Sequence, residues 1–334
     1  METLEIGTSG IVASRVALGT WAIGGWMWGG TTDLRESIDT IASAIARGIT
    51  LIDTAPIYGF GRSETIVGMA LAAGLRERAV IATKGGLEWQ DGKVWRNCSP
   101  ARIREEVEQS LRRLRTDYID LYQVHWPDPA VPIPETAEAL ARLLKEGKIR
   151  AIGVSNYSPA QMAEFRQAAP IHSVQPPYNL FERAADDGVL PYAAQHQIAV
   201  LCYGALCRGL LTGTLTASTR FKGDDLRRND PKFQEPRFSQ YLAAVASLDR
   251  YARQRYGVSV LALAVRWVLD QGDTIALWGA RHPSQLEPVQ DTMGWALDDE
   301  AKGRIEQILR QTVADPVGPE FMAPPARPTA ALPA

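Results

Sequence analysis

The feature that most constrains the fold of this 334-residue chain is a regular alternation of short apolar runs with longer amphipathic segments. Many of the runs are apolar on both faces, as is typical of buried parallel strands. Each run is followed by a segment with the apolar spacing and terminal residues of a helix. Eight such units follow one another along the chain. The strands are expected at residues 16–18, 51–53, 80–83, 119–124, 149–154, 173–175, 199–203 and 274–277.

Eight strand–helix units in a chain of this length predict a closed (β/α)8 barrel, the TIM barrel fold. The alternative is a doubly wound open sheet, which would need a GxGxxG turn after its first strand, and none opens a helix there. We also expect an N-terminal β-hairpin and an extra C-terminal helix at about Asp299–Arg310. Residues 1–314 should form one domain. Residues 315–334 are rich in proline and alanine, which favours a disordered tail over a flap across the barrel mouth.

Composition narrows the class of protein. A net charge near −2 gives no field that would collect nucleic acid or anionic lipid. No apolar run approaches the ~18 residues needed to span a bilayer. The N-terminus lacks the basic region and apolar core of a secretory signal, so a cytoplasmic location is expected. Three cysteines without CxxC spacing fit a reducing compartment, and the scattered histidines predict no metal site.

Polar side chains end three consecutive predicted strands. Asp53, Lys84 and His125 end the second, third and fourth strands, and Tyr58 lies in the loop after the second. In a (β/α)8 barrel these positions converge at one mouth. A lysine near a phenol favours the phenolate and lowers its pKa, a carboxylate keeps the lysine charged, and a histidine orients a carbonyl oxygen. This set predicts proton transfer at a carbonyl or alcohol oxygen, and a redox reaction would require a cofactor.

Each of these residues also has a structural explanation when it is taken alone. Asp53 and Lys84 could be a structural ion pair, Tyr58 a rim aromatic and His125 a core histidine. Together, four polar groups at the ends of three apolar strands are hard to explain by packing, because buried charges need partners. We therefore interpret them as one site.

The sequence resembles the aldo-keto reductase family from residue 16 to about residue 291. The resemblance implies NAD(P)H-dependent carbonyl reduction in a TIM barrel. It also implies that the four residues above are the catalytic set and that Tyr58 is the general acid. The chain is most similar to the bacterial branch with the motif GLLTG after the seventh strand. The motifs that carry the resemblance are LIDTAPIYG at 51–59, SLRRL at 110–114, YIDL at 118–121, HWP at 125–127, GKIRAIGVSN at 147–156 and QPPYN at 175–179.

The resemblance implies that the nicotinamide end of the coenzyme is bound at the ends of the fifth to seventh strands. Ser155, Asn156 and Gln175 would bind the carboxamide, which suits their hydroxyl and amide groups. Tyr203 would stack on the nicotinamide ring. The expected coenzyme contacts are Thr20, Trp21, Ser155, Asn156, Gln175, Tyr203, Gly204, Leu206, Arg208, Gly209, Leu211, Gly279, Arg281 and Gln285.

The same resemblance describes the far end of the coenzyme. The loop from Gly204 to Gly213 would strap over the pyrophosphate, where glycines permit close backbone approach. Arg281 stands beside a helix N-terminus, where the family holds the 2′-phosphate, so NADPH is the expected coenzyme and NADH is possible. Val289 stands where the family often has an amide that reaches adenine, and its side chain cannot make that hydrogen bond.

The loops expected on the catalytic face are rich in tryptophan. Trp28, Trp89 and Trp126 predict a substrate pocket with aromatic walls. The predicted function is reduction of aldehydes or simple ketones by a monomer or weak homo-oligomer. Its partner would be a small carbonyl or alcohol substrate, with no nucleic acid and no membrane. The alternatives are a nicotinamide-binding regulatory subunit of a membrane partner, with little turnover, and a redox-free isomerase or hydrolase.

Overall fold

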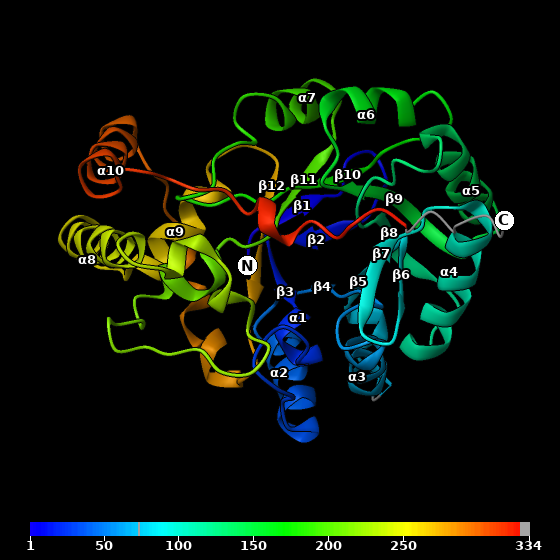
Figure 1. Cartoon of the computed structure of the whole chain (residues 1–334), viewed down its shortest axis with the longest axis horizontal. Helices are drawn as coiled ribbons and strands as arrows, with labels where there is room; N and C mark the ends of the chain where they lie inside the picture. Colours follow the sequence, from blue (N-terminus) through cyan, green and yellow to red (C-terminus); the bar gives the residue numbers. More distant parts are fainter. Residues whose placement is uncertain (73, 328–334) are drawn as a thin grey trace, which may run out of the picture.

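The structure is a computed structural model that describes residues 1–72 and 74–327. Eight parallel strands close a barrel in which β12 pairs with β3, as the sequence predicts for a (β/α)8 fold. Figure 1 shows helices surrounding this barrel. In the order in which they lie around the barrel, the strands are β3 (Val16–Gly19), β4 (Leu51–Asp53), β5 (Val80–Gly85), β8 (Ile119–Val124), β9 (Ile149–Ser155), β10 (Ser173–Gln175), β11 (Ala199–Cys202) and β12 (Thr274–Gly279).

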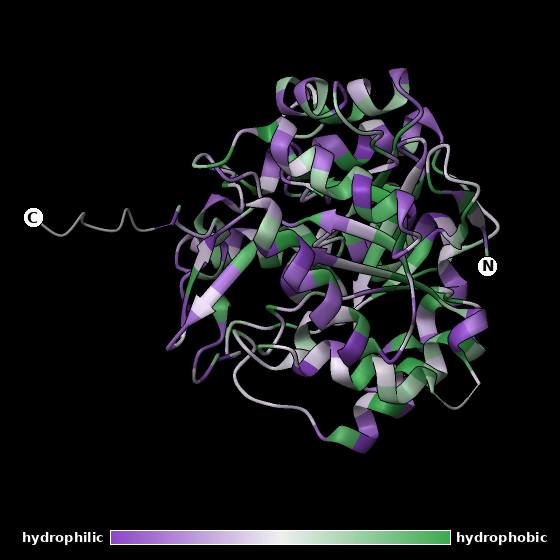
Figure 2. Ribbon diagram, turned by 90° about the vertical axis from the view of Figure 1, so that its right-hand side faces the viewer, coloured by the Kyte–Doolittle hydropathy of each residue, from purple (hydrophilic) through white to green (hydrophobic). Residues whose placement is uncertain are grey.

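The helices that cover the barrel are amphipathic, and their ribbons alternate hydrophobic and hydrophilic segments in Figure 2. The segment Pro283–Thr292, which follows the eighth strand, is a 3-10 helix (η5) with Pro288 inside it. The extra C-terminal helix is present. The helices are α1 (Trp21–Gly24), α2 (Leu34–Ala46), α3 (Arg62–Leu71), α4 (Pro100–Leu114), α5 (Ile133–Lys145), α6 (Pro159–Phe165), α7 (Val189–Gln195), α8 (Arg237–Tyr256), α9 (Val260–Leu269) and α10 (Asp299–Thr312).

Side chains inside the barrel form a small apolar core. Alternate residues of a strand face opposite sides of a sheet, so one set points inward and the other packs on the helices. Leu51, Ala82 and Leu121 belong to the inner core. Ile52 and Ile81 belong to the larger core between strands and helices. The inward residues that follow Leu51, Ala82 and Leu121 in this alternation are polar, and they form the candidate site.

Two antiparallel hairpins lie at the ends of the barrel. The predicted N-terminal hairpin, β1 (Thr3–Glu5) and β2 (Val12–Ser14), contributes Ile6 to the inner core and closes the base. The second hairpin, β6 (Leu87–Gln90) and β7 (Lys93–Arg96), follows β5 and was not predicted. Its turn is Asp91-Gly92, with φ angles of 51° and 75°. This dipeptide at positive φ is a strong hairpin signal, so the sequence did contain the information.

The end of the chain crosses the barrel mouth. After α10, residues 313–327 run over the centre of the barrel toward β7, where Arg96 donates hydrogen bonds to the carbonyl oxygens of Pro324 and Pro325. The favoured expectation of a disordered tail is therefore wrong for residues 315–327, which have the flap arrangement, and residues 328–334 lie outside the described residues. None of the helices in the described part of the chain is long and apolar enough to cross a membrane.

Candidate active site

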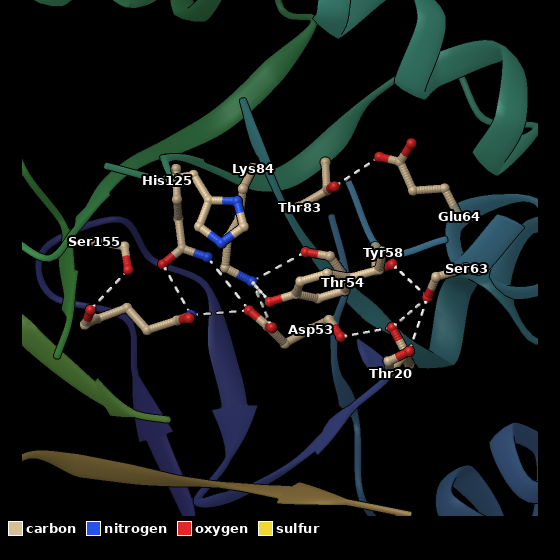
Figure 3. Close-up of polar contacts among 12 residues, drawn as sticks. Thr20, Asp53, Thr54, Tyr58, Ser63, Glu64, Thr83, Lys84, His125 and Ser155 are labelled. Carbon is tan, nitrogen blue, oxygen red and sulfur yellow. Dashed lines mark hydrogen bonds and ion pairs between the residues drawn. The ribbon is translucent and has the colours of Figure 1, made fainter. Parts of the chain in front are cut away.

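The barrel alternation brings three predicted site residues together on the floor of the mouth. Asp53, Lys84 and His125 follow inward residues on the neighbouring strands β4, β5 and β8. The Nζ atom of Lys84 is 2.6 Å from Oδ1 of Asp53, 3.0 Å from the carbonyl oxygen of Thr54 and 3.2 Å from the hydroxyl oxygen of Tyr58. Figure 3 shows Lys84 between the carboxylate and the phenol. These contacts join Tyr58, Lys84 and Asp53 in one hydrogen-bonded chain.

The second oxygen of Asp53 also has partners. Gln175 donates to Oδ2 of Asp53 over 2.9 Å, and Gln123 lies 3.4 Å from the same oxygen. The two amides also bond to each other at 3.2 Å. Gln123 was not predicted from the sequence, although it lies two residues before His125 and therefore on the same inward face. The carboxylate is thus held from both sides.

Tyr58 is positioned by the tight turn after β4. The next residue, Gly59, has φ of 69°, and a Cβ atom there would lie 2.2 Å from the carbonyl oxygen of Gly24. Only glycine fits this position, because positive φ and close backbone contact both exclude a side chain. The ring of Tyr58 stacks on Trp21 at 5.7 Å between centroids and meets the ring of His125 edge-on at 5.8 Å. The phenol is thus clamped between two aromatic rings.

Burial controls the charge of the site residues. Burial, and behind it the Asp53 carboxylate, raises the pKa of Tyr58 well above its ordinary value. The net shift is therefore upward and not downward as Lys84 alone would predict, because desolvation of the phenolate outweighs the nearby ammonium group. Burial also lowers the pKa of Lys84, which Asp53 opposes, and burial and the Lys84 charge hold the pKa of His125 well below its ordinary value. The site therefore contains a protonated phenol and a neutral imidazole.

A cavity of about 670 Å³ lies above this floor. Twelve of the fourteen expected coenzyme residues line it, as do Trp28 and Trp126. Thr20 does not line the cavity: it is fully buried, and its hydroxyl donates to the backbone oxygen of Asp53 over 2.9 Å. Leu211 is buried in the larger core between strands and helices. Trp89 packs on Phe60 at 5.8 Å and is absent from the cavity lining.

Amide and hydroxyl groups form a network at the ends of β9 and β10. Asn156, at φ of 62°, donates from Nδ2 to the carbonyl oxygen of His125 and to the Ser155 hydroxyl, each over 3.0 Å. Ser155 donates to the carbonyl oxygen of Gln175, and the Tyr203 hydroxyl bonds to Oδ1 of Asn156 at 3.0 Å. The expected carboxamide-binding residues therefore form a connected group beside the polar floor.

Two arginine side chains lie at the far end of the cavity. Arg281 and Arg227 both line it, and their guanidinium groups lie 5.6 and 5.1 Å from the centre of the Trp28 ring. Burial and the neighbouring Arg227 lower the pKa of Arg281. Arg227 was not predicted from the sequence. Val289 is fully buried in the core beneath, so its position is one of packing.

Loops distant in sequence close the cavity at its rim. The Asp224 carboxylate accepts hydrogen bonds from the backbone N–H groups of Met27 and Gly29 over 2.8 and 3.0 Å. The charged stretch around Asp224 is therefore docked on the loop after β3. Residues 321–325 of the C-terminal segment form a further part of the lining. The Asp224 contacts were not predicted from the sequence, and for the C-terminal segment a flap across the mouth was only the less favoured alternative.

The barrel and its polar floor define a class of protein, and comparison with known proteins identifies it. The aldo/keto reductase family model matches residues 15–310. The chain belongs to this family and is an NAD(P)H-dependent oxidoreductase.

Individual relatives cover almost the whole chain. The chain is 60% identical over 329 residues to aldo-keto reductase YhdN of Bacillus subtilis, covering 98% of this chain and 99% of the relative. It is 40% identical to the NADH-specific methylglyoxal reductase of Escherichia coli, over 86% of this chain and 91% of that protein. Its structure is similar to that of the glycerol dehydrogenase AKR11B4 from Gluconobacter oxydans. The TM-score is 0.87 at 56% identity, with 96% of this chain and 99% of the other covered.

Proposed function

We propose that this protein reduces uncharged aldehydes or simple ketones to alcohols with NADPH, and that Tyr58 donates the proton to the carbonyl oxygen. The observation that carries the proposal is the chain of contacts from Asp53 through Lys84 to Tyr58, 2.6 and 3.2 Å long, at the floor of the cavity. The Lys84 ammonium group stabilises the phenolate that remains after the proton has left. In the reverse direction the phenolate accepts the proton of an alcohol.

The remaining floor residues support this role for Tyr58. Its raised pKa keeps the phenol protonated, as a proton donor requires. His125 is neutral, and its ring lies edge-on to Tyr58, where it orients a carbonyl oxygen next to the phenol. Asp53 is held by Gln175 and so keeps the Lys84 ammonium group in place.

The cavity fits a dinucleotide coenzyme. Its volume of about 670 Å³ lies within the usual ~300–1,000 Å³ of ligand sites. Ser155, Asn156 and Gln175 provide the polar groups for a carboxamide at one end, and Arg281 provides a cation for a phosphate at the other. When bound, the reduced nicotinamide supplies the hydride.

The substrate class follows from the residues packed around Tyr58. Ala55, Ile57, Tyr58 and Leu87 form an apolar cluster, and the residues packed against it are Trp21, Trp26, Trp89, Val94 and Trp126. All of these except Ala55 and Trp89 line the cavity. Such apolar walls favour small uncharged carbonyl compounds over phosphorylated ones, because a buried charge without a partner is costly. The names of the Escherichia coli and Gluconobacter relatives, methylglyoxal reductase and glycerol dehydrogenase, support small substrates of this kind.

The test of the proposed reaction is loss of NADPH absorbance with a panel of aldehydes and ketones. We expect turnover with uncharged aldehydes and little with phosphorylated ones. Tyr58→Phe should lower kcat by about 10²–10⁴-fold, the usual contribution of general acid catalysis, and should leave NADPH affinity unchanged. Binding of NADPH without turnover of any carbonyl compound by the wild-type protein would exclude the proposal.

The preference for NADPH rests on Arg281 and is tested separately. Removal of a cation that binds the 2′-phosphate, as in Arg281→Gln, should weaken NADPH binding by about tenfold and leave NADH binding unchanged. Dissociation constants from fluorescence titration measure both. Equal losses for NADPH and NADH would show that Arg281 does not read the 2′-phosphate.

A further inference from the structure

A cluster of four buried charges lies beside the cavity, away from the catalytic floor. It consists of Glu182, Arg208, Asp230 and Lys232, whose exposed fractions are 3%, 6%, 0% and 0%. Arg208 donates from Nε to Asp230 over 2.5 Å and from its terminal nitrogens to Glu182. Lys232 pairs with Glu182 at 2.8 Å. We call these four residues the ion cluster.

The charges of the ion cluster balance, two positive against two negative. Burying them has a large desolvation cost, which good geometry and further hydrogen bonds must offset. The guanidinium group of Arg208 forms ion pairs with both carboxylates, those of Glu182 and Asp230. Although Arg208 lines the cavity, its contacts indicate that it holds other parts of the protein in place.

One of these parts is the loop Gly204–Gly213, which we call the strap. Arg208 belongs to the strap and has φ of 52°, a left-handed conformation that its ion pairs maintain. Asn179 extends the cluster to the start of the strap. Its Nδ2 donates to Glu182 over 2.8 Å and to the carbonyl oxygen of Gly204 over 2.9 Å. The cluster thus fixes the strap at two positions.

The other part is the C-terminal segment, residues 315–327, which crosses the mouth in Figure 1. Lys232 donates from Nζ to the carbonyl oxygen of Gly318 over 3.1 Å. The guanidinium carbon of Arg208 lies 5.9 Å from the centre of the Phe321 ring, within the range of a cation–π contact. Phe321 and Met322 both line the cavity, and Phe321 is the one that has an aromatic ring to offer Arg208.

We propose that Arg208 is a positioning residue shared by the strap and the C-terminal segment, so that the coenzyme site and the substrate wall are set by one anchor. This inference rests on the proposed function. It also takes the strap to cover the coenzyme, as the family resemblance implies, and residues 321–325, which line the cavity, to bound the substrate pocket. Its consequence is specific: Phe321, on the substrate wall, contributes to coenzyme affinity through Arg208, whereas Met322 does not.

The first test compares three variants of the C-terminal segment. Phe321→Leu should weaken NADPH binding about threefold, the scale of one partly exposed cation–π contact, and should also raise the aldehyde KM. Phe321→Tyr keeps the ring and should restore the wild-type affinity for NADPH. Met322→Ala should raise only the aldehyde KM. NADPH affinity is measured by fluorescence titration without aldehyde. Unchanged NADPH affinity in Phe321→Leu would overturn the inference.

The second test needs no coenzyme and no turnover. Lys232→Met removes the bond to Gly318 and one charge of the ion cluster. Hydrogen exchange followed by mass spectrometry should show faster exchange in both residues 204–213 and residues 315–327, with α5 unchanged as the check of folding. Faster exchange in only one of the two segments would overturn the shared anchor. If wild-type protein lacks NADPH turnover, the proposed function fails, and this exchange result still decides about the anchor.

Discussion

The floor and the mouth of the barrel are built by different kinds of contact. On the floor, Asp53 and Lys84 belong to the paired strands β4 and β5, so backbone register places one beside the other. At the mouth, Asp224 binds the backbone of Met27, which is 197 residues away in sequence. Arg96 binds the carbonyl oxygen of Pro324, 228 residues away.

Under the proposed function, this difference separates the residues of the chemical step from the residues that select the ligand. Residues on adjacent strands are held at fixed spacing by the sheet, which suits groups that must pass a proton. Loops that meet across the mouth depend on a few side-chain bonds, and such segments open more readily than core strands. We therefore expect changes on the floor to affect rate and stability, and changes at the mouth to affect the binding of ligands.

The largest effect is expected from breaking the floor ion pair. Lys84→Met leaves the Asp53 carboxylate buried with only amide partners, and removing one member of a buried pair costs about 3–5 kcal/mol of unfolding free energy. Both side chains are almost fully buried, with exposed fractions of 0% and 2%, so solvent screening offers no relief. Denaturant unfolding measures the loss, and turnover should fall with it.

Lys145→Met is the matched control for Lys84→Met. Lys145 is exposed in the last turn of α5, so its replacement should leave the unfolding free energy within about 0.5 kcal/mol of wild type. If Lys84→Met and Lys145→Met had the same unfolding free energy, the ion pair on the floor would not stabilise the protein.

The floor could be predicted from the sequence better than the mouth, because strand register places the floor residues and long-range loop contacts build the mouth. Apolar runs and the residues that end them were sufficient to predict the barrel, because period-two alternation is a local property of sequence. Asp53 and Lys84 were correctly brought together in this way. Gln123 follows from the same rule and was overlooked. Thr20 was assigned to the coenzyme by resemblance, yet it supports the backbone of Asp53.

The mouth contains information that no local pattern carries. The composition of residues 315–334 indicated disorder, also for the C-terminal segment 315–327, because it offers little surface to bury. The segment is held instead through its own carbonyl oxygens, which accept bonds from Arg96 and Lys232. Backbone acceptors are present in every sequence, so only the position of the partners reveals such an arrangement. The direction of the pKa shift of Tyr58 is likewise not visible in the local sequence, because it depends on how deeply the folded chain buries the phenol.

Acidification provides a second way to examine the floor. His125 stays neutral in the folded protein because its pKa is well below its ordinary value of 6.5. The unfolded chain takes up a proton near pH 6.5, so it binds more protons than the folded state below that pH. The unfolding free energy should therefore decrease as pH falls below about 6.5, by at most about 1.4 kcal/mol per pH unit from this residue. The measurement is the unfolding free energy from denaturant titrations between about pH 7.5 and pH 5, a range that spans the ordinary histidine pKa of about 6.5.

The pH effect is assigned with two histidine variants. His125→Gln should reduce the slope of stability against pH in this range. His196→Gln makes the same replacement at the end of α7, where the histidine packs on Tyr192 away from the floor, and it serves as the matched control. A wild-type slope in His125→Gln would mean that the floor does not exclude a proton from this imidazole.

The smallest effect separates two tryptophans at the mouth. Trp126 lines the cavity, and Arg96 holds it at 5.5 Å from its guanidinium group to the ring centre. Trp126→Ala should raise the aldehyde KM by about tenfold, the effect of losing on the order of 50 Å² of apolar contact. Trp89 instead packs between Phe60 and Arg102, so Trp89→Ala should leave KM within about twofold of wild type, as expected for a residue without ligand contact. An equal increase of the aldehyde KM in both variants would contradict this distinction and would mean that Trp89 also contacts the substrate.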